Sequence, residues 1–405
     1  MIYKELKNYY YKDNTLEQYN KEYNTRFNSV STIKFPIKIA ENQSFCVVTS
    51  EILGLIEKIY KLNNSIDELL YSLPGVAIKQ YINQLLVDEI KSTNEIEGIH
   101  STRKEILLTL KNQNKKNSLQ GIITKYLLLI EKRDINIESL SDFKSLYTQM
   151  ILPEINEIED LPDGEFFRKK EVYVQDYSGK KIHTGIIPEN QINANMMQII
   201  EFMSNDNKES LFIKTAIVQY FIGYTHPYYD GNGRLSRFLG SYILSKAPFK
   251  NILSTISLSN AIMKNRKKYY KAFDMCNDKK NKGDITPFII FILEILCSES
   301  NQIIVDLTKK QELLKRQEKN LDLLLNNKGL NKKKYEGIFE LMYTFIQNAL
   351  FHPKELLDVK TIANALNLSK GTVRARLEHA INLGFNIEIK INGTTALYKY
   401  NLPKQ

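Results

Sequence analysis

The sequence predicts a mainly α protein, in which a helical bundle carries one β-hairpin and is followed by a C-terminal winged helix-turn-helix domain of the α+β type. Three observations support this prediction. Apolar residues recur at helical spacing through most of the chain. Residues 170–186 have the alternation and turn residues of a hairpin. Residues 335–405 hold two short helical segments and then two strands around Asn392-Gly393, a strong hairpin signal.

The N-terminal elements are predicted to be helices. Residues 1–45 are polar and rich in Asn and Tyr, so we expect only a partly ordered lead-in there. Apolar residues at helical spacing predict an amphipathic helix over 51–70 and another over 76–97. The second helix should stop at Gly98, since glycine readily adopts the left-handed conformation that ends helices. A capping box at residues 102–105 predicts the start of the next helix.

The remaining elements follow in order along the chain. Helical spacing resumes at Pro188, after the hairpin, and continues to about Ser300. Widely spaced leucines among dense lysines then predict a linker helix. The last block reads as helices over 359–366 and 371–383 and strands over 387–391 and 396–400, the order of a winged helix-turn-helix. The chain thus divides into an N-terminal helical region at 1–135 with the helix at 76–98, a helical core at 136–300 with the hairpin at 170–186, a linker helix at 301–334 and the winged-helix domain at 335–405.

Composition excludes several classes of protein. With 43 % hydrophobic and 25 % charged residues, the chain is not a disordered one. Cys46, Cys276 and Cys297 are too few and too far apart for a disulfide framework or a zinc cluster, which favours a reducing compartment. The N-terminus lacks an apolar signal region, and the longest apolar run, residues 288–296, is interrupted by Glu294 and too short to span a bilayer. We therefore expect a cytoplasmic protein with no membrane partner.

The net charge is +10, from 56 Lys and Arg against 46 Asp and Glu. Such a basic balance is typical of proteins with a nucleic-acid or other acidic partner. Half of the excess, +5, lies in residues 301–334, however, and only +2 lies in residues 335–405. The net charge therefore argues only weakly for nucleic acid.

The segment with the clearest chemical meaning runs from Thr225 to Arg237, THPYYDGNGRLSR. A proline disfavours the helical conformation of the residue before it, so His226 should end one helix and lie on a loop. The glycines on either side of Asn232 allow backbone N–H groups to form a concave nest, and the positive N-terminus of the next helix faces the same cavity. Arg234 and Arg237 project from its first turn. Together these features predict a phosphate site with a base beside it.

This segment resembles the motif of the Fic family, His-x-Phe-x-(Asp/Glu)-Gly-Asn-Gly-Arg-x-x-Arg. Every position matches except Tyr228, which replaces Phe, a mild change for a ring that packs in the core. The resemblance covers most of residues 50–300. It implies a Fic-type all-α catalytic core that transfers AMP from ATP to a Ser, Thr or Tyr hydroxyl of a target protein. Members with other residues in the glycine positions use different chemistry, so the two glycines here favour adenylylation.

The resemblance also implies roles for single residues. His226 would take the proton from the attacking hydroxyl, a task for a group that titrates near neutrality. Asp230, a hard oxygen ligand, would bind Mg²⁺, or Mn²⁺ in its place, against the phosphates of ATP. The nucleotide-binding residues would be Asp230, Gly231, Asn232, Gly233, Arg234, Leu235, Ser236 and Arg237 of the motif, Ile182, His183 and Thr184 of the hairpin, and Tyr269, Tyr270 and Asn277 at the adenine and ribose.

Two of these segments also have ordinary interpretations. The hairpin resembles the family's flap, which clamps the target by strand addition, but His183 also fits an exposed hairpin residue. The pair Tyr269 and Tyr270 also fits a helix that faces the core.

Residues 92–98 resemble the family's inhibitory motif, (Ser/Thr)-x-x-x-Glu-(Gly/Asn), with Thr93, Glu97 and Gly98 in the matching positions. A Glu97 carboxylate paired with Arg237 would occupy the place of the γ-phosphate, so ATP would bind in an unproductive pose. Because this motif precedes the core, the chain resembles the subgroup that is inhibited by an N-terminal helix of the same polypeptide. Gly98 is equally a normal helix cap.

Two alternative functions stay open. In some family members the same glutamate orients a water and the enzyme removes AMP, so Glu97 fits an enzyme that removes AMP from its target as well as one that adds it. The expected recognition helix carries Lys370, Arg374 and Arg376 against Glu378, which also fits a DNA-binding transcriptional regulator with a nucleotide-sensing domain. We expect ATP as a substrate, self-AMPylation, and either a monomer or a homodimer; the sequence does not identify the target protein.

Overall fold

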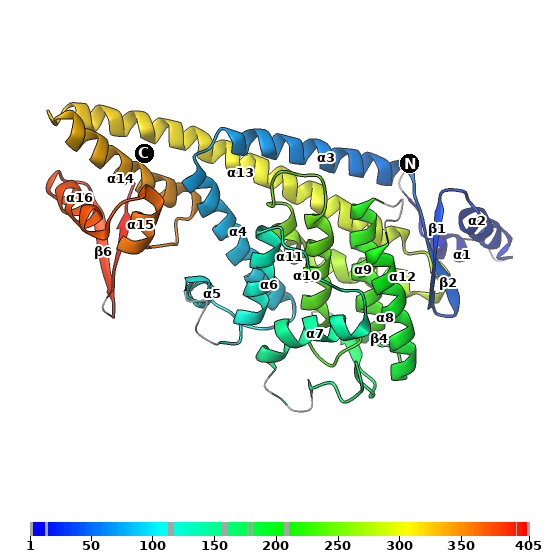
Figure 1. Cartoon of the computed structure of the whole chain (residues 1–405). Coiled ribbons are helices and arrows are strands. Elements are labelled where there is room, and N and C mark those ends of the chain that lie inside the picture. The colour runs from blue at the N-terminus through cyan, green and yellow to red at the C-terminus, as the bar shows by residue number, and fades with distance from the viewer. Residues whose placement is uncertain are drawn as a thin grey trace. The chain divides into compact units, whose positions relative to one another are not determined.

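The computed structural model describes residues 3–12, 15–111, 117–155, 157, 160–175, 178–179, 181–205, 210–393 and 395–402. The described chain is mainly helical with short β-hairpins, which confirms the predicted fold class (Figure 1). It divides into two compact units, one formed by Met1–Asn64 with Leu86–Asn301 and the other by Ser65–Leu85 with Gln302–Gln405.

The first unit holds most of the helices. They are α1 (Leu6–Tyr10), α2 (Glu17–Phe27), most of α3 (Ser50–Tyr71), the second half of α4 (Gly75–Ile96), α5 (Arg103–Lys111), α6 (Gln120–Ile130), α7 (Leu140–Met150), α8 (Glu189–Ser204), α9 (Leu211–Thr225), α10 (Asn232–Ser245), α11 (Leu258–Lys264), α12 (Arg266–Asn277) and the start of α13 (Thr286–Asn326). Short 3-10 turns lie at Leu152–Glu154 (η1), Thr255–Ser257 (η3) and Lys279–Asn281 (η4), and two hairpins pair β1 (Thr32–Ile39) with β2 (Asn42–Val47) and β3 (Tyr173–Gln175) with β4 (Lys181–Thr184).

The core of this unit is built around α9 and α10. The sequence of α9 is apolar on nearly every face, and almost all of its residues are buried. A helix that is hydrophobic all round belongs in a protein interior, because no face of it is suited to water. α8 and α10 pack directly against α9, and α6 and α11 pack against α10 (Figure 1). This arrangement places the loop between α9 and α10, residues 226–231, at one end of the core.

Several predicted boundaries are confirmed. The helices expected over 51–70 and 76–97 are α3 and α4, and Gly98 has a positive φ of 76°, as a helix-ending glycine should. Thr102 and Glu105 form the expected capping box, with a Thr102 N to Glu105 Oε2 distance of 2.8 Å. β3 and β4 pair antiparallel with Val174 opposite His183, and the turn residues 176, 177 and 180 lie outside the described residues.

The long helix α13 replaces the separate linker helix that we predicted over 301–334. The helix continues unbroken from Thr286 to Asn326, and α14 begins at Lys332. Its later leucines, Leu307, Leu314, Leu321 and Leu325, are buried, because their spacing of seven and four residues places them on one face. By length and composition α13 could cross a membrane, contrary to our expectation, but 67 % of its most apolar 18-residue window is buried, as in the core helix of a soluble fold.

The second unit contains a three-stranded sheet and the helices that cover it. Its elements are the second parts of α3 and α13, the first half of α4, α14 (Lys332–Phe351), β5 (Leu357–Asp358), α15 (Val359–Leu366), α16 (Lys370–Asn382), β6 (Ile387–Asn392) and β7 (Thr395–Tyr400), with strand order β5-β7-β6. Asp358 and Ser369 cap α15 and α16 by accepting from the backbone N–H of Thr361 and Thr372. The helix and strand ranges agree with the sequence, and the winged-helix assignment itself stays a prediction.

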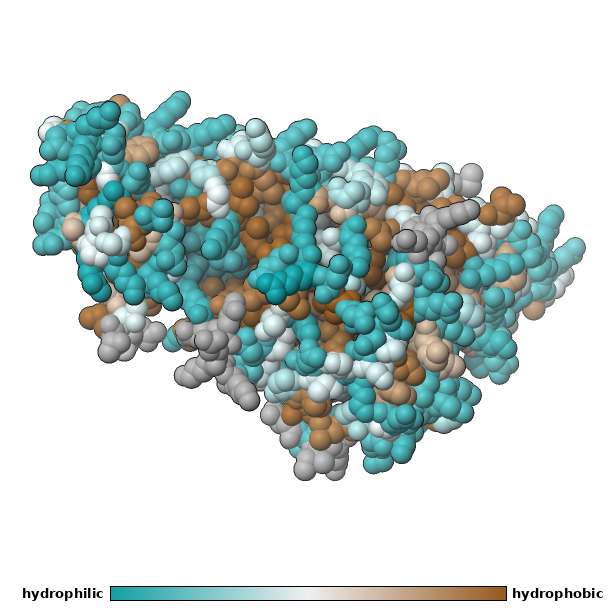
Figure 2. Space-filling model, in the orientation of Figure 1, coloured by the Kyte–Doolittle hydropathy of each residue, from teal (hydrophilic) through white to brown (hydrophobic). Residues whose placement is uncertain are grey.

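Hydrophilic side chains spread over the face shown in Figure 2, with hydrophobic residues gathered between them in several places. The exposed large hydrophobic residues come from separated parts of the chain, from Tyr11 to Ile391. Single exposed apolar side chains are normal on folded proteins.

The described residues of the N-terminal segment, 3–12 and 15–45, form helices and a hairpin, so the expectation of a partly ordered lead-in is wrong for them. α1, α2 and the β1–β2 hairpin form a small lobe with its own core, in which Leu6, Tyr19 and Phe45 are buried. Five further aromatic or apolar side chains from Tyr9 to Phe27, and Val47, pack against that core. The tyrosines that made the segment look polar supply its interior, because a tyrosine ring is apolar and only its hydroxyl needs a partner.

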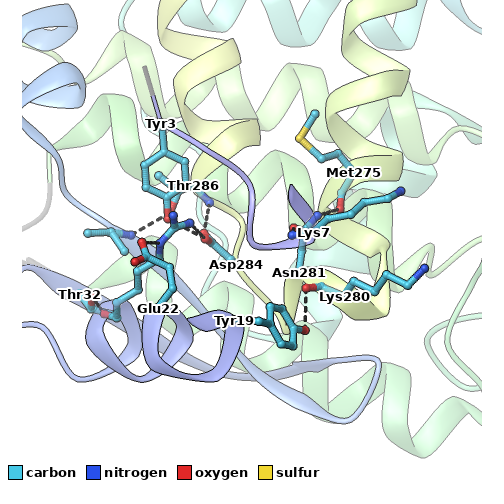
Figure 3. A network of polar contacts seen from close by, with 12 residues as sticks. Tyr3, Lys7, Tyr19, Glu22, Thr32, Met275, Lys280, Asn281, Asp284 and Thr286 are labelled. Carbon is cyan, nitrogen blue, oxygen red and sulfur yellow. Dashed lines mark hydrogen bonds and ion pairs between the residues drawn. The ribbon is translucent and has the colours of Figure 1, made fainter. Parts of the chain in front are cut away.

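A buried polar network joins this lobe to the start of α13 (Figure 3). The Tyr3 hydroxyl donates to Asp284 Oδ2 at 2.6 Å, and Arg26 Nη1 lies 3.2 Å from the same oxygen. Thr286 N–H donates to Asp284 Oδ1 at 3.0 Å, and Arg26 also pairs with Glu22. Asp284 is 1 % exposed. The buried Asp284 carboxylate therefore accepts from donors on both sides of this contact and is one of the points at which the lobe is attached.

We predict that Asp284→Ala destabilises the chain by about 3 kcal/mol, because it leaves the buried Arg26 guanidinium with only Glu22 as a counter-charge. Chemical denaturation should measure this change, and hydrogen exchange should locate it in α1 and α2. Tyr3→Phe, which keeps the ring and removes one hydrogen bond, should cost only about 1 kcal/mol. Equal stability of Asp284→Ala and the unaltered chain would contradict the anchoring role.

Candidate functional site

The loop between α9 and α10 has the conformation that its sequence predicts. His226 ends α9 with φ 50° and ψ 62°, and α10 begins at Asn232 after Gly231. Gly231 has φ 81°, a left-handed value that glycine adopts without strain. The loop therefore reverses the chain within five residues and leaves the N-terminus of α10 open to one side.

Two side chains brace this loop from inside. Asn232 accepts from Tyr228 N–H at 2.9 Å and donates to the Tyr228 carbonyl at 2.8 Å. Tyr228 is fully buried, and its ring stacks on Tyr147 at 3.5 Å between ring centres. The prediction that the Tyr228 ring packs in the core is confirmed. Tyr147 also donates its hydroxyl to the Asp230 carbonyl at 3.2 Å.

Arg168 is a further support, and our sequence analysis did not identify it. The side chain is fully buried, and its guanidinium donates to the carbonyls of His226 at 2.8 Å, Lys170 at 2.6 Å and Ile186 at 2.9 Å. Arg168 thus fixes the histidine loop and both ends of the β3–β4 hairpin at once. Burial lowers its pKa to about 10, which leaves it charged at neutral pH. No spacing pattern marks this residue, because its partners are backbone atoms distant in the chain.

A cavity of about 180 Å³ opens beside the loop. Four segments of the first unit line it: the residue after α4, strand β3, the end of α9 with the α9–α10 loop and the first two turns of α10, and α12. Its lining residues are Glu97, Tyr173, Val174, Gly223, His226, Tyr229, Asp230, Gly231, Asn232, Gly233, Ser236, Arg237, Tyr269, Tyr270 and Phe273. The structure therefore brings together the histidine, the glycine nest, Arg237, the two α12 tyrosines and Glu97, as we predicted from the sequence.

Other predicted site residues lie outside the cavity lining. His183 stacks on Tyr224 with 4.5 Å between ring centres, and its Nε2 lies 2.6 Å from the Tyr224 carbonyl oxygen. Asn277 accepts a hydrogen bond from the Tyr220 hydroxyl at 2.6 Å. The hairpin lines the cavity with Tyr173 and Val174 of β3 instead of with Ile182, His183 and Thr184 of β4. Leu235, on α10, is fully buried.

Arg237 is held by residues at the end of α4. Its Nε donates to Thr93 Oγ1 at 2.8 Å, and its Nη2 donates to the Thr93 carbonyl at 2.9 Å and lies 2.8 Å from Glu97 Oε1. Gly98, the last predicted inhibitory residue, ends this segment with a positive φ and is not among the cavity-lining residues. The predicted pairing of Glu97 with Arg237 is thus present.

The Glu97 carboxylate lies over the first turn of α10. A Cβ added to Gly233 would be 2.0 Å from Glu97 Oε1 and 2.9 Å from Arg237 Nη1. Any side chain at Gly233 would therefore collide with the pair. Since the backbone N–H groups and dipole of a helix N-terminus attract anions, Glu97 occupies the position that is best suited to a phosphate.

The charges of the cavity groups follow from burial and this ion pair. Burial acts to raise the pKa of the Glu97 carboxyl, but the charge of Arg237 and its hydrogen bond outweigh burial and hold the pKa below its ordinary value. Arg237 correspondingly has a raised pKa, because Glu97 outweighs the effect of burial. Burial lowers the pKa of His226 to about 4, despite the opposing charge of Glu97. At neutral pH the cavity thus contains a neutral imidazole and a closed ion pair.

Arg234 points away from the cavity. The side chain is fully buried; its Nη1 pairs with Glu154 of η1 and its Nη2 lies 2.8 Å from Asp230 Oδ2. Arg234 is absent from the cavity lining. The two arginines of the motif therefore differ in their surroundings, although they are one turn apart on the same helix.

Asp230 is the group in the cavity that fits a metal ion. Its side chain is 39 % exposed and lines the cavity, while its Oδ1 accepts from Gly231 N–H at 2.5 Å. Among the described residues no cluster of three or more His, Cys, Asp or Glu side chains could hold an ion. One carboxylate near a phosphate-binding helix end fits Mg²⁺, which usually combines one or two carboxylates with substrate phosphates and water.

Comparison with known proteins agrees with this geometry. A sequence profile described as the Fic/DOC family matches residues 138–244. The protein adenylyltransferase Fic of Aedes aegypti is 26 % identical over 277 residues, which cover 67 % of this chain and 44 % of that protein. Its namesake in Drosophila melanogaster is 29 % identical over 175 residues, or 42 % of this chain and 30 % of that protein. The chain thus spans less than half the length of these curated relatives.

One solved structure has the same fold over most of its length. It is a Fic family protein from Desulfovibrio desulfuricans, with a TM-score of 0.52 and 17 % sequence identity over 89 % of this chain and 98 % of that one. At this identity the likeness concerns the fold alone. The matched profile, the curated relatives and the helix–loop–helix motif agree that this chain contains a Fic domain at residues 138–244.

Proposed function

We propose that the chain is a protein adenylyltransferase, which transfers AMP from ATP to a Ser, Thr or Tyr hydroxyl of a protein. One observation carries the proposal: a single cavity contains a neutral histidine, a helix N-terminus with a glycine nest and an arginine that binds a carboxylate in the place of a phosphate. The names of the curated relatives support the same activity. The proposal specifies the acceptor group of the target, a side-chain hydroxyl, and does not name the target protein.

The cavity residues have distinct tasks in this reaction. The phosphates of ATP lie on the N–H groups of Gly231 to Gly233 and on Arg237, and the adenine ring packs beside Tyr269 and Tyr270. The hydroxyl oxygen attacks the α-phosphorus, the bond to the pyrophosphate oxygen breaks, and the hydroxyl proton passes to His226. Arg237 and the helix dipole stabilise the charge that develops on the phosphates. The products are AMP bound to the protein hydroxyl and pyrophosphate.

Asp230 would hold the divalent cation that accompanies ATP, Mg²⁺ or Mn²⁺. Bound there, the ion would neutralise phosphate charge and orient the leaving group. Tyr147 and the Gly231 N–H keep the Asp230 backbone and carboxylate in place.

Glu97 would regulate this activity. Its carboxylate occupies both the N-terminus of α10 and the Arg237 guanidinium, the two features that a γ-phosphate needs. Thr93 adds two further contacts to the same guanidinium. ATP would therefore bind without its productive phosphate contacts until the end of α4 moves, so the resting enzyme is autoinhibited.

The same placement also supports removal of AMP. Glu97 is about a quarter exposed and lines the cavity together with His226, so its carboxylate could orient a water toward a bound AMP-protein linkage. Incubation of an AMP-modified target with the unaltered chain and with Glu97→Gly separates the two activities. The substitution should raise the rate of AMP transfer. It should lower the rate of AMP removal, because the water-orienting carboxylate is lost.

For the second unit we propose a winged helix-turn-helix that binds duplex DNA. Lys370 and Arg374 are exposed on α16, the second helix of the pair, and β6 and β7 form the wing. Arg376, which we had included in the basic face, instead pairs with Glu340 of α14 at 2.7 Å. Only two of the three predicted cations therefore face solvent, which makes this interface a weakly basic one.

We predict that Glu97→Gly raises incorporation of labelled AMP by on the order of a hundredfold, because Arg237 and the helix end become available to the γ-phosphate. Autoradiography of self-modified protein measures the change. Adding His226→Ala should remove the gain, since general-base catalysis contributes about 10²- to 10⁴-fold. Glu95→Gly is the matched control: the same substitution two residues earlier, in the last turn of α4, at a residue that pairs with Lys91. An unchanged rate in Glu97→Gly would refute the inhibition, and normal transfer without His226 would refute the base.

We predict that the activity of the Glu97→Gly variant does not fall at the ordinary histidine pKa when the pH is lowered. Because burial places the pKa of His226 at about 4, and loss of Glu97 removes a charge that raises it, the imidazole stays neutral as the pH falls from about 8 to 5. The value of kcat/KM for Glu97→Gly should therefore be level over that range in a constant-ionic-strength buffer. A decline with a midpoint near 6.5 would show that His226 is solvated and titrates normally.

We predict that Lys370→Ala and Arg374→Ala each weaken binding of the full chain to duplex DNA. Each should also lower, by about 1, the magnitude of the slope of log binding constant against log salt concentration. Arg376→Ala is the control and should leave both quantities unchanged, because its guanidinium is already paired. Fluorescence anisotropy across a salt series measures both. Absence of binding at low salt would exclude the regulator.

A further inference from the structure

Among the described ion pairs, two acidic side chains from outside the motif reach a motif arginine. Glu97 pairs with Arg237, and Glu154 pairs with Arg234. Glu154 ends the 3-10 turn η1, its side chain is 5 % exposed, and it pairs with Arg234 Nη1. Neither the motif nor the cavity includes it. A carboxylate buried at this depth is costly unless it is paired, so its presence needs a reason.

The segment that carries Glu154 supports the motif loop at three points. Tyr147 stacks on Tyr228 and donates to the Asp230 carbonyl, as described above. Ile151 packs on the loop so closely that a Cβ added to Gly231 would lie 2.2 Å from its Cγ2. Glu154 then reaches Arg234. Because residues 147–154 contact both the loop and the first turn of α10, the position of Glu154 relative to the motif is closely determined.

The pairing divides one guanidinium between two carboxylates. Arg234 gives Nη1 to Glu154 and Nη2 to Asp230. Asp230 therefore receives a single charged hydrogen bond from Arg234, and two carboxylates share one positive charge. Burial raises the pKa of Glu154 to about 7 although the charge of Arg234 opposes that rise, so this carboxylate is ionised above pH 7 and the group as a whole is then negative.

Without Glu154 the same guanidinium would have one carboxylate left. A planar guanidinium prefers to donate two parallel hydrogen bonds to one carboxylate, so Arg234 would turn fully toward Asp230. Both Asp230 oxygens would then be engaged by a cation of the protein itself. A divalent ion would have to compete with that cation for the carboxylate.

We propose that Glu154 is a positioning residue, which holds Arg234 so that the Asp230 carboxylate remains available to the divalent cation of the nucleotide complex. This inference rests on the proposed function, because it assigns the cation–ATP complex to the cavity. In this arrangement Arg234 orients Asp230 from behind, and Arg237 is the motif arginine that meets the phosphates.

The test measures ATP affinity without turnover at pH 8, where Glu154 is ionised, in the full chain carrying Glu97→Gly and His226→Ala. Isothermal titration gives the dissociation constant of ATP with Mg²⁺ and with EDTA, and the ratio of the two is the metal enhancement. Glu154→Gln should reduce the metal enhancement by about tenfold, because a charge next to the cation site is lost and Arg234 competes for Asp230. The EDTA affinity should stay equal or become tighter, since one negative charge near the triphosphate is gone.

Two further variants separate positioning from structural damage. Glu165→Gln removes the same charge at an exposed position of the neighbouring segment and should leave the metal enhancement unchanged. Glu154→Gln combined with Arg234→Gln removes the competitor as well, and should recover metal enhancement relative to Glu154→Gln alone. A general loss of structure would instead weaken ATP binding equally with Mg²⁺ and with EDTA, and the double variant would be worse.

The outcomes distinguish this inference from the proposed function. If the parent variant does not bind ATP at all, the proposed function and this inference both fail. If it binds ATP with metal enhancement, and Glu154→Gln leaves that enhancement intact or weakens both affinities alike, the positioning role alone is overturned. A selective loss of metal enhancement that the double variant relieves establishes it.

Discussion

The site depends on the side chain of Asn232, which makes two hydrogen bonds to the backbone of Tyr228 across the α9–α10 loop. These bonds close the loop into a fixed reversal, so that His226 at the end of one helix faces the N-terminus of the next. A loop of this length has few ways to satisfy its own backbone groups, and a buried amide with one donor and one acceptor satisfies two of them. The histidine, the glycine nest and the motif arginines take their relative positions from this closure.

The charge of the two motif arginines is balanced by three carboxylates, two of which come from outside the loop. Arg237 is neutralised by Glu97 at the end of α4, and Arg234 is shared between Asp230 and Glu154 of η1. Each of these two motif guanidiniums thus has a counter-charge, which lowers the cost of burying it. The two pairs differ in one respect that matters for function: the Glu97 pair lies in the open cavity, where a phosphate can replace it, whereas the Glu154 pair is closed off from it.

The N-terminal lobe contacts the segment that follows α12, the helix of Tyr269 and Tyr270. Tyr19 donates to the Lys280 carbonyl at 2.8 Å, Lys7 N–H donates to Asn281 at 3.0 Å, and Phe45 pairs with the backbone of Gly283 and Ile285. One end of the aromatic wall of the cavity is therefore attached to residues that we expected to be only partly ordered. Composition misled us there, because the lobe uses tyrosine where most cores use leucine or phenylalanine.

The sequence by itself determined the helical class, the hairpin, the limits of the helices on either side of His226, and the pairing of Glu97 with Arg237. These features depend on local rules, namely glycine and proline dihedrals, capping and periodicity, or on a motif with narrow spacing. Only the tertiary structure decided that Arg168, Tyr147 and Glu154 support the loop, that β3 lines the cavity instead of β4, and that Arg234 points away from it. Those outcomes depend on which backbone carbonyls and buried charges meet across distant segments, and in a packed interior that is settled by the fit of whole elements, which no local pattern records.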